Sequence, residues 1–177
     1  MAVLKKIVLG VGVLIALVVV VGLFLPQQYK VERSILINAQ PEEIYPDVVD
    51  LRAWQNWGVW FQRDPSMEID YSGPDRAIGM MSSWKSVTEG NGEMKITDLE
   101  HNKKVVYSLA FPEWEMGSTG SLVISPAGEA TKVTWVDSGD VGNNIISRYF
   151  VLMMDGMIGP DFEMGLENLK TVVENKG

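Results

Sequence analysis

The feature that most constrains this chain is an apolar run near its start. Residues 7–25, "IVLGVGVLIALVVVVGLFL", are 19 consecutive residues without a charged or polar side chain. As an α-helix rising about 1.5 Å per residue, such a run spans roughly 28 Å, close to the thickness of the hydrocarbon core of a bilayer. The sequence therefore predicts a membrane-spanning helix, followed by a folded domain.

A cleaved signal peptide is the alternative interpretation, because Lys5 and Lys6 precede the run. The apolar region of a signal peptide is about 7–15 residues long and ends in a small-x-small cleavage site. This run is longer and ends in Phe24-Leu25-Pro26. We therefore expect residues 1–6 to form a short tail and residues 7–25 to remain as an uncleaved anchor.

Charges on either side of the run predict the topology. Lys5 and Lys6 lie before it, and Lys30 and Arg33 lie after it. The positive-inside rule favours a cytoplasmic N-terminus, with the domain on the extracytoplasmic (periplasmic) side of a single-pass protein. Only residues 26–30 link the anchor to the domain. The four residues from Gln27 to Lys30 span about 12 Å when extended, so the domain is expected to sit against the bilayer.

The charge of the domain argues against some partners. Of 15 basic residues in the chain, two are the lysines of the tail, which leaves 13 against 23 acidic residues and a formal net charge of −10. An acidic domain without a basic cluster is poorly suited to bind nucleic acid or anionic headgroups by charge. The absence of cysteine excludes disulfides and cysteine-ligated metal sites.

Periodicity predicts an α+β domain over residues 31–177. A first strand alternates over residues 30–38, and a short helix follows from Pro41, which Pro46 limits in length. Six runs with a period of two then lie between residues 67 and 137, separated by turn residues, and they predict an antiparallel meander.

The C-terminal segment has the spacing of a helix. Ile146, Phe150, Met153 and Met157 recur at helical intervals and predict an apolar face, as do Phe162, Leu166, Leu169 and Val173. Because Pro160 lacks a backbone donor, we expect a kink at Gly159-Pro160, with the helix covering one face of the sheet.

The soluble part of the sequence resembles a known family. The stretches "VERSILINAQPEEIYPDVVDLRAWQNWGVW", "GNGEMKITDLE", "KKVVYSLAF", "TKVTWVDSGDVG" and "RYFVLMMDGMIGPDFEMGLENLK" are similar to the polyketide-cyclase-like branch of the START/Bet v 1 helix-grip superfamily (SRPBCC). The resemblance covers about residues 30–174. It implies a curved antiparallel sheet that grips a long C-terminal helix, with an apolar cavity between them, in which many members bind lipids, sterols or polyketides.

Two sets of residues are candidates for lining this cavity. Arg33 and Asp137 lie on the inner face by strand parity, and in the fold that the resemblance implies the first and last strands are neighbours. The two side chains could therefore form a buried ion pair that holds a polar group of a ligand, and a structural salt bridge is the alternative. The apolar candidates, for which ordinary core packing is the alternative, are Trp54, Trp57, Trp60, Met80, Trp84, Met94, Tyr107, Trp135, Phe150, Met153 and Met157.

The sequence offers little support for catalysis. There is no cysteine or Gly-x-Ser-x-Gly motif, the one histidine, His101, lies in a charged turn, and zinc and calcium patterns are missing. We therefore predict no catalytic residue, metal or cofactor. The expected function is a membrane-tethered module that binds a hydrophobic small molecule or lipid. The alternatives are an accessory subunit of a membrane protein complex and, third, a cyclase or hydratase-type enzyme.

Overall fold

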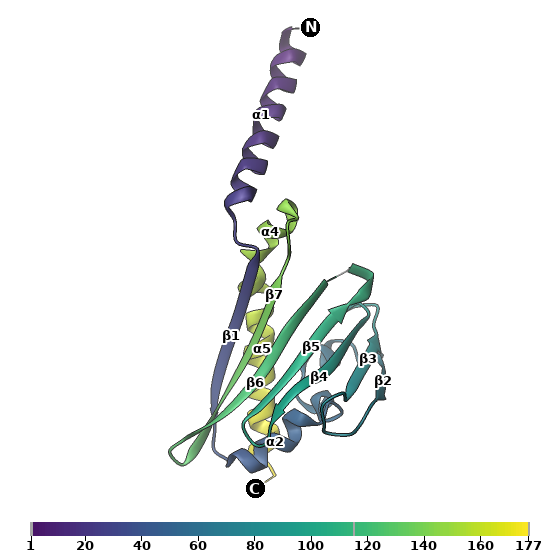
Figure 1. Cartoon of the computed structure of the whole chain (residues 1–177), viewed down its shortest axis with the longest axis vertical. Helices are drawn as coiled ribbons and strands as arrows, with labels where there is room; N and C mark the ends of the chain where they lie inside the picture. Colours follow the sequence, from purple (N-terminus) through teal and green to yellow (C-terminus); the bar gives the residue numbers. More distant parts are fainter. Residues whose placement is uncertain (1, 115, 177) are drawn as a thin grey trace.

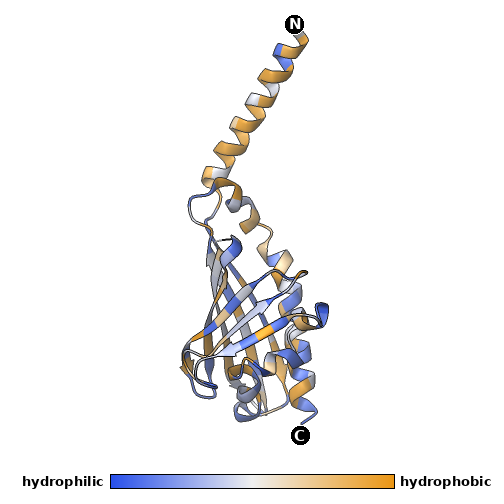
Figure 2. Ribbon diagram, turned by 90° about the vertical axis from the view of Figure 1, so that its right-hand side faces the viewer, coloured by the Kyte–Doolittle hydropathy of each residue, from blue (hydrophilic) through white to orange (hydrophobic). Residues whose placement is uncertain are grey.

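A computed structural model describes residues 2–114 and 116–176 of the chain. One long helix, α1 (Ala2–Phe24), projects from an α+β domain (Figure 1). Of this helix, 22 residues, Val3–Phe24, are long and apolar enough to cross a membrane, and most of their side chains are exposed. Figure 2 shows the helix in the colour of hydrophobic residues along nearly its whole length.

The domain is built on one antiparallel sheet of seven strands in the order β1-β7-β6-β5-β4-β3-β2. The six runs predicted from the period of two form β2 to β7, so the meander is confirmed. The strands are β1 (Gln28–Ile37), β2 (Glu68–Ser72), β3 (Met81–Lys85), β4 (Gly92–Glu100), β5 (Lys104–Phe111), β6 (Met116–Ala127) and β7 (Ala130–Asp140).

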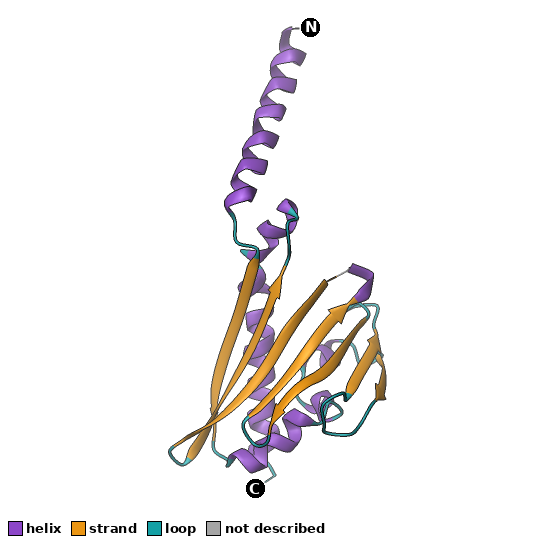
Figure 3. Ribbon diagram, in the orientation of Figure 1, coloured by secondary structure: helices purple, strands orange, loops and turns teal. Residues whose placement is uncertain are grey.

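Short helices close one end of the sheet, and a long helix covers its inner face (Figure 3). A capping box between Gln40 and Glu43, with Pro41 in the first turn, starts the helix after β1. The helical elements of the domain are α2 (Pro41–Val49), η1 (Ala53–Asn56), α3 (Val59–Arg63), η2 (Pro112–Trp114), α4 (Ile145–Val151) and α5 (Met154–Glu174). The helix-grip fold expected from the resemblance is therefore present.

The register of the strands defines one end of the sheet that faces α1. Gln28, the first residue of β1, pairs with Asp140, the last residue of β7. Thr119 of β6 pairs with Ser138 of β7, and the end of β5 pairs with the start of β6. We call this the anchor end of the sheet, and the connections from β4 to β5 and from β6 to β7 lie at the opposite end (Figure 1).

The C-terminal segment breaks at a different place from the one predicted. The helix ends at Val151 and restarts at Met154, whereas α5 is continuous across Pro160. Gly156, whose carbonyl would have accepted the missing hydrogen bond, is exposed like Pro160, so water can satisfy that carbonyl. The helix therefore does not end at Gly159-Pro160, and the break in the segment lies at residues 152–153 instead.

Moving the break also changes which face of the segment is buried. The predicted apolar face of Ile146, Phe150, Met153 and Met157 is exposed. The second half of the prediction is confirmed, because Phe162, Leu166, Leu169 and Val173 are buried against the sheet.

Candidate functional site

A cavity of about 300 Å³ lies between the inner face of the sheet and the N-terminal half of α5. Apolar side chains make most of its wall, and they come from strands β1 to β6, from the short helices η1, α3 and η2, and from α5. Seven of the predicted residues line it: Trp54, Trp60, Trp84, Met94, Tyr107, Met157 and Asp137. These residues lie on the inner face of the sheet, the face on which the family resemblance implied a cavity.

Three of the predicted residues are core residues outside the cavity wall. Trp57, Met80 and Trp135 are each at most 1% exposed. Trp135 stacks on Phe162 of α5 with the ring centroids 4.1 Å apart, so its surface is used in joining the sheet to the helix. For these three residues the core-packing interpretation holds.

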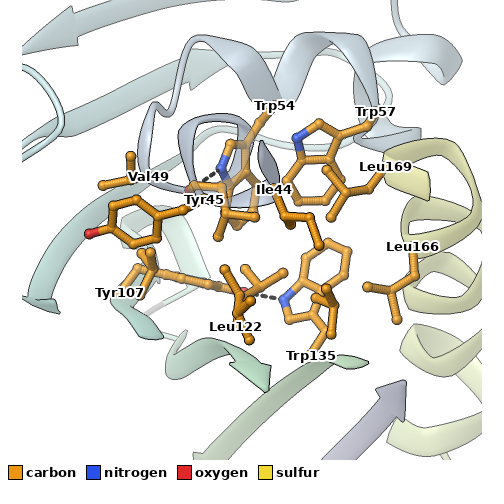
Figure 4. Packing of buried hydrophobic residues seen from close by; sticks show 14 of the residues in the cluster. Ile44, Tyr45, Val49, Trp54, Trp57, Tyr107, Leu122, Trp135, Leu166 and Leu169 are labelled. Carbon is orange, nitrogen blue, oxygen red and sulfur yellow. Dashed lines mark hydrogen bonds between the residues drawn. The ribbon is translucent and has the colours of Figure 1, made fainter. Parts of the chain in front are cut away.

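Hydrogen bonds of the buried indole rings hold this aromatic core in place (Figure 4). The Nε1–H of Trp54 donates to the Val48 carbonyl at 2.9 Å, and that of Trp135 donates to the Tyr107 hydroxyl at 2.8 Å. Buried Trp and Tyr groups need such partners, and a satisfied network holds the rings in place. The inner end of the cavity is thus a rigid wall of aromatic rings.

Phe150 and Met153 do not line the cavity. Both are 50% exposed, because the helix break after Val151 turns them away from the sheet. The α5 residues that replace them in the wall are Met154 and Ile158, which follow from helical spacing once the break is placed correctly.

The predicted pair of Arg33 and Asp137 does not form. Arg33 faces the inner side as expected, but it donates to Asp155 at 2.8 Å and to Glu163 at 2.6 Å, both on α5. The register sets Val31 opposite Asp137, and Gly159 on α5 leaves the space in which the guanidinium lies. Arg33 therefore holds the helix to β1, as in the structural salt bridge that was the alternative.

Asp137 instead forms a polar end of the cavity with two hydroxyl groups. Tyr29 donates to its Oδ1 at 3.2 Å and Ser118 donates to its Oδ2 at 2.8 Å. Asp137 is 3% exposed, and this burial raises the pKa of its carboxyl group, against the opposing effect of the two hydrogen bonds. Burial likewise raises the pKa of Tyr29, so its phenol stays protonated at neutral pH.

Several wall residues were missing from the prediction. Tyr29 has the parity of Val31 in β1, and Leu109 has the parity of Tyr107 in β5, so alternation was a sufficient signal for both. Trp114 and Met116 lie at the turn from β5 to β6, where no periodic pattern signals the direction of a side chain. Phe61, Met67, Ile69, Phe111, Ile158 and Phe162 complete the apolar wall.

The exposed part of the cavity lining marks its mouth, which lies toward the anchor end of the sheet, at the turn from β5 to β6 and near the start of α5. Its rim includes Met157, Trp114 and Met116, which are large apolar side chains about half exposed to solvent. Asp161 of α5 and Glu89 also line the cavity, and Arg63 joins them, donating to Asp161 at 2.8 Å and to Glu89 at 3.0 Å. We call these three residues the rim ion cluster.

Other features offer weaker sites. A hollow of about 750 Å³ lies among the first residues of β1 and β6 and the last residues of β7, but it is wide open and its lining is mainly polar. Within the described residues, no group of three or more His, Cys, Asp or Glu side chains could hold a metal ion. His101 is exposed in its turn, with its ring against Tyr45.

Solved structures of low sequence identity share this fold. A Thermobifida fusca protein, 16% identical, matches with a TM-score of 0.65 over 82% of this chain and 93% of its own. Norcoclaurine synthase from Thalictrum flavum, solved with dopamine and hydroxybenzaldehyde, is 10% identical, with a TM-score of 0.62 over 85% and 88%. The Aha1 dimer from Colwellia psychrerythraea is 22% identical, with a TM-score of 0.55 over 80% and 96%.

No protein of curated function matches the sequence at a significant level. A family model, described as polyketide cyclase / dehydrase and lipid transport, matches residues 28–174, which is nearly the whole domain after α1. The chain therefore belongs to the polyketide cyclase, dehydrase and lipid transport family.

Proposed function

We propose that this protein is a membrane-tethered module that binds a hydrophobic small molecule or lipid in the cavity between the sheet and α5. The observation that carries the proposal is the cavity itself, an apolar space of about 300 Å³ with a polar end at Asp137. Small-molecule sites are typically apolar cavities of this order with a few polar groups that orient the ligand. The family description, which includes lipid transport, is consistent with this chemistry.

The position of α1 supports the proposal that the ligand comes from the bilayer. α1 is long enough to span a membrane, and only Leu25, Pro26 and Gln27 separate it from β1. The mouth of the cavity is at the same end of the domain. A ligand dissolved in the bilayer would therefore reach the cavity over a short distance.

The proposal is tested by photo-crosslinking with the full chain in phosphatidylcholine vesicles. A fatty acid or phospholipid with a diazirine on its acyl chain is added, the sample is irradiated, and the modified peptides are identified by mass spectrometry. We expect modification of the cavity wall, in particular of β4 and β5 peptides that contain Met94 and Tyr107. Modification of α1 alone would contradict the proposal.

A matched pair of variants controls this test. Leu109→Trp places an indole in the cavity and should reduce crosslinking of the wall several-fold. Leu36→Trp makes the same change at an exposed position of β1, where it should have no effect on crosslinking. Circular dichroism melting of both variants checks that a loss of crosslinking is not a loss of fold.

An enzymatic role is the second candidate, and Asp137 is the observation that favours it. A buried carboxyl group with a raised pKa, bonded to the hydroxyl of Tyr29 inside a cavity, has the properties of a general acid or base. The test is to incubate the carried ligand with the wild type and with Asp137→Asn and to compare ligand masses. A chemical change made only by the wild type supports an enzyme; an unchanged ligand in both supports binding alone.

A further inference from the structure

The helix α4 packs on the end of α1 through polar and close contacts. The hydroxyl of Tyr149 donates to the Val18 carbonyl at 2.6 Å, and the Nη1 of Arg148 donates to the Leu23 carbonyl at 3.0 Å. Gly22 makes the approach possible, because a Cβ there would collide with the side chain of Ile145. The two helices therefore dock as a unit at the anchor end of the domain.

These contacts solve a specific problem of a membrane-spanning helix. The last carbonyls of a helix have no partner within it, and unsatisfied carbonyls are costly near hydrocarbon. Arg148 supplies donors to the carbonyls of Leu23 and, at 3.5 Å, Gly22, and it places a positive charge at the negative end of the helix dipole. Arg and Tyr are also residues that membrane interfaces favour.

The depth of the contact places α4 at the bilayer. Val18 lies six residues before Phe24, the last residue of α1, so it is about 9 Å along the helix axis from that end at a rise of about 1.5 Å per residue. If α1 spans the hydrocarbon core, the Val18 carbonyl lies inside the edge of that core. The hydroxyl of Tyr149, which donates to this carbonyl, must then lie at the same depth, and the backbone of α4 beside it lies in the interface.

The other side of α4 is apolar and unpaired with the domain. Ile146 is 72% exposed, Leu152 is 60% exposed, and Phe150 and Met153 are 50% exposed. Residues 145–154, "IISRYFVLMM", contain no acidic residue, although the domain as a whole is strongly acidic. Segments of this kind, apolar with an Arg and an aromatic hydroxyl, suit the region between headgroups and acyl chains.

We propose that α4 and the turn after it, residues 145–153, form a second membrane contact that inserts into the interface beside α1. The partner of this apolar surface is the lipid bilayer, because α4 is docked on the segment that enters it. The exposed rim residues Met157, Trp114 and Met116 then face the same leaflet. Two contacts fix the orientation of the domain and hold the cavity mouth at the source of ligand. This inference rests on the tether of the proposed function.

The test is the depth of single spin labels on the full chain in vesicles of phosphatidylcholine and phosphatidylglycerol. The chain has no cysteine, so each label site needs one substitution in a clean background. Labels at Phe150→Cys and Leu152→Cys report on the proposed contact, and a label at Val13→Cys reports on the middle of α1. Leu36→Cys is the matched control, since Leu36 is an exposed aliphatic residue near the opposite end of β1.

We expect the ratio of oxygen to nickel-chelate accessibility to be several-fold higher at positions 150 and 152 than at position 36, and highest at position 13. Equal ratios at 150, 152 and 36, with a high ratio at 13, would overturn the second contact and leave the anchor intact. A low ratio at 13 would overturn the anchor, and with it both the tether and this inference. All four sites are exposed, so each substitution leaves the core unchanged.

Discussion

At the residue scale, Asp137 is the most consequential polar side chain of the domain. It lies at the end of an apolar cavity and accepts hydrogen bonds from Tyr29 and Ser118 rather than from a cation. Parity placed Asp137 and Arg33 on the inner face from sequence alone, but it could not give their partners. Those depend on the register between β1 and β7 and on the space at Gly159, which are properties of the assembled fold.

Replacing Asp137 by Asn tests the effect of burial on its titration. Because burial raises the pKa of Asp137 in the folded state above its ordinary value of 3.8, the folded protein binds more protons than the unfolded protein above that pH. Its contribution to the free energy of unfolding is therefore favourable at low pH and falls as pH rises through the raised pKa.

The expected result is a pH-dependent difference between the two proteins. The stability of Asp137→Asn relative to the wild type should increase from about pH 4 upward, by about 1.4 kcal/mol for each unit by which burial raises the pKa. Thermal unfolding across pH, followed by circular dichroism, measures it. A difference that stays constant with pH would show that Asp137 titrates as it does in the unfolded chain.

At the element scale, the C-terminal segment is where sequence and structure differ most. After Pro160 the apolar spacing correctly predicted the buried face of the helix, because Phe162, Leu166 and Leu169 pack on the sheet. Before Pro160 the same spacing was misleading, because exposed apolar residues of α4 have the periodicity of a core face. A pattern shows that side chains avoid water, but it does not distinguish a protein core from a bilayer.

Pro160→Ala tests the continuity of α5. The substitution restores a donor to the Gly156 carbonyl and removes the crowding of the ring, so the free energy of unfolding should rise by about 1–3 kcal/mol. Chemical denaturation of both proteins measures this change. Ligand crosslinking should not change, because the helix is already continuous; a large change in crosslinking would indicate a kink at Pro160 after all.

The rim ion cluster is expected to slow the passage of ligand. Arg63, which is about half exposed, joins Asp161 of α5 to Glu89 in the loop before β4, both at the cavity wall, and ion pairs that solvent can reach weaken with salt. Arg63→Ala should therefore increase the rate at which a fluorescent fatty acid enters from vesicles and remove the salt dependence of that rate. Arg52→Ala, which breaks an exposed pair with Asp75, is the matched control and should leave the rate unchanged.

At the scale of the whole molecule, α1, α4 and the cavity mouth lie together at one end. The fold class and the seven-stranded sheet with its covering helix could be predicted from periodicity and from the resemblance. The relation of the cavity to α1 could not, because it depends on the packing of Ile145, Arg148 and Tyr149 on α1, more than 120 residues away in the sequence.

The side of the membrane on which the domain lies stays a prediction. Lys5 and Lys6 favour a cytoplasmic N-terminus and an extracytoplasmic domain. Alkaline phosphatase fused after Lys176, an enzyme active only outside the cytoplasm, should be active in cells. Activity of a cytoplasmic reporter at the same site would reverse this topology.

The central claim is that the cavity holds an apolar molecule taken from the bilayer. The most direct measurement is native mass spectrometry of the full chain released from its own membranes, with Leu109→Trp and Leu36→Trp purified in parallel. We predict one bound hydrophobic molecule on the wild type and on Leu36→Trp, and its loss from Leu109→Trp. A wild-type chain that carries no small molecule would contradict the claim. Isolation of the chain in a fixed ratio with another protein, with its cavity empty, would also contradict it and would favour an accessory subunit of a membrane complex.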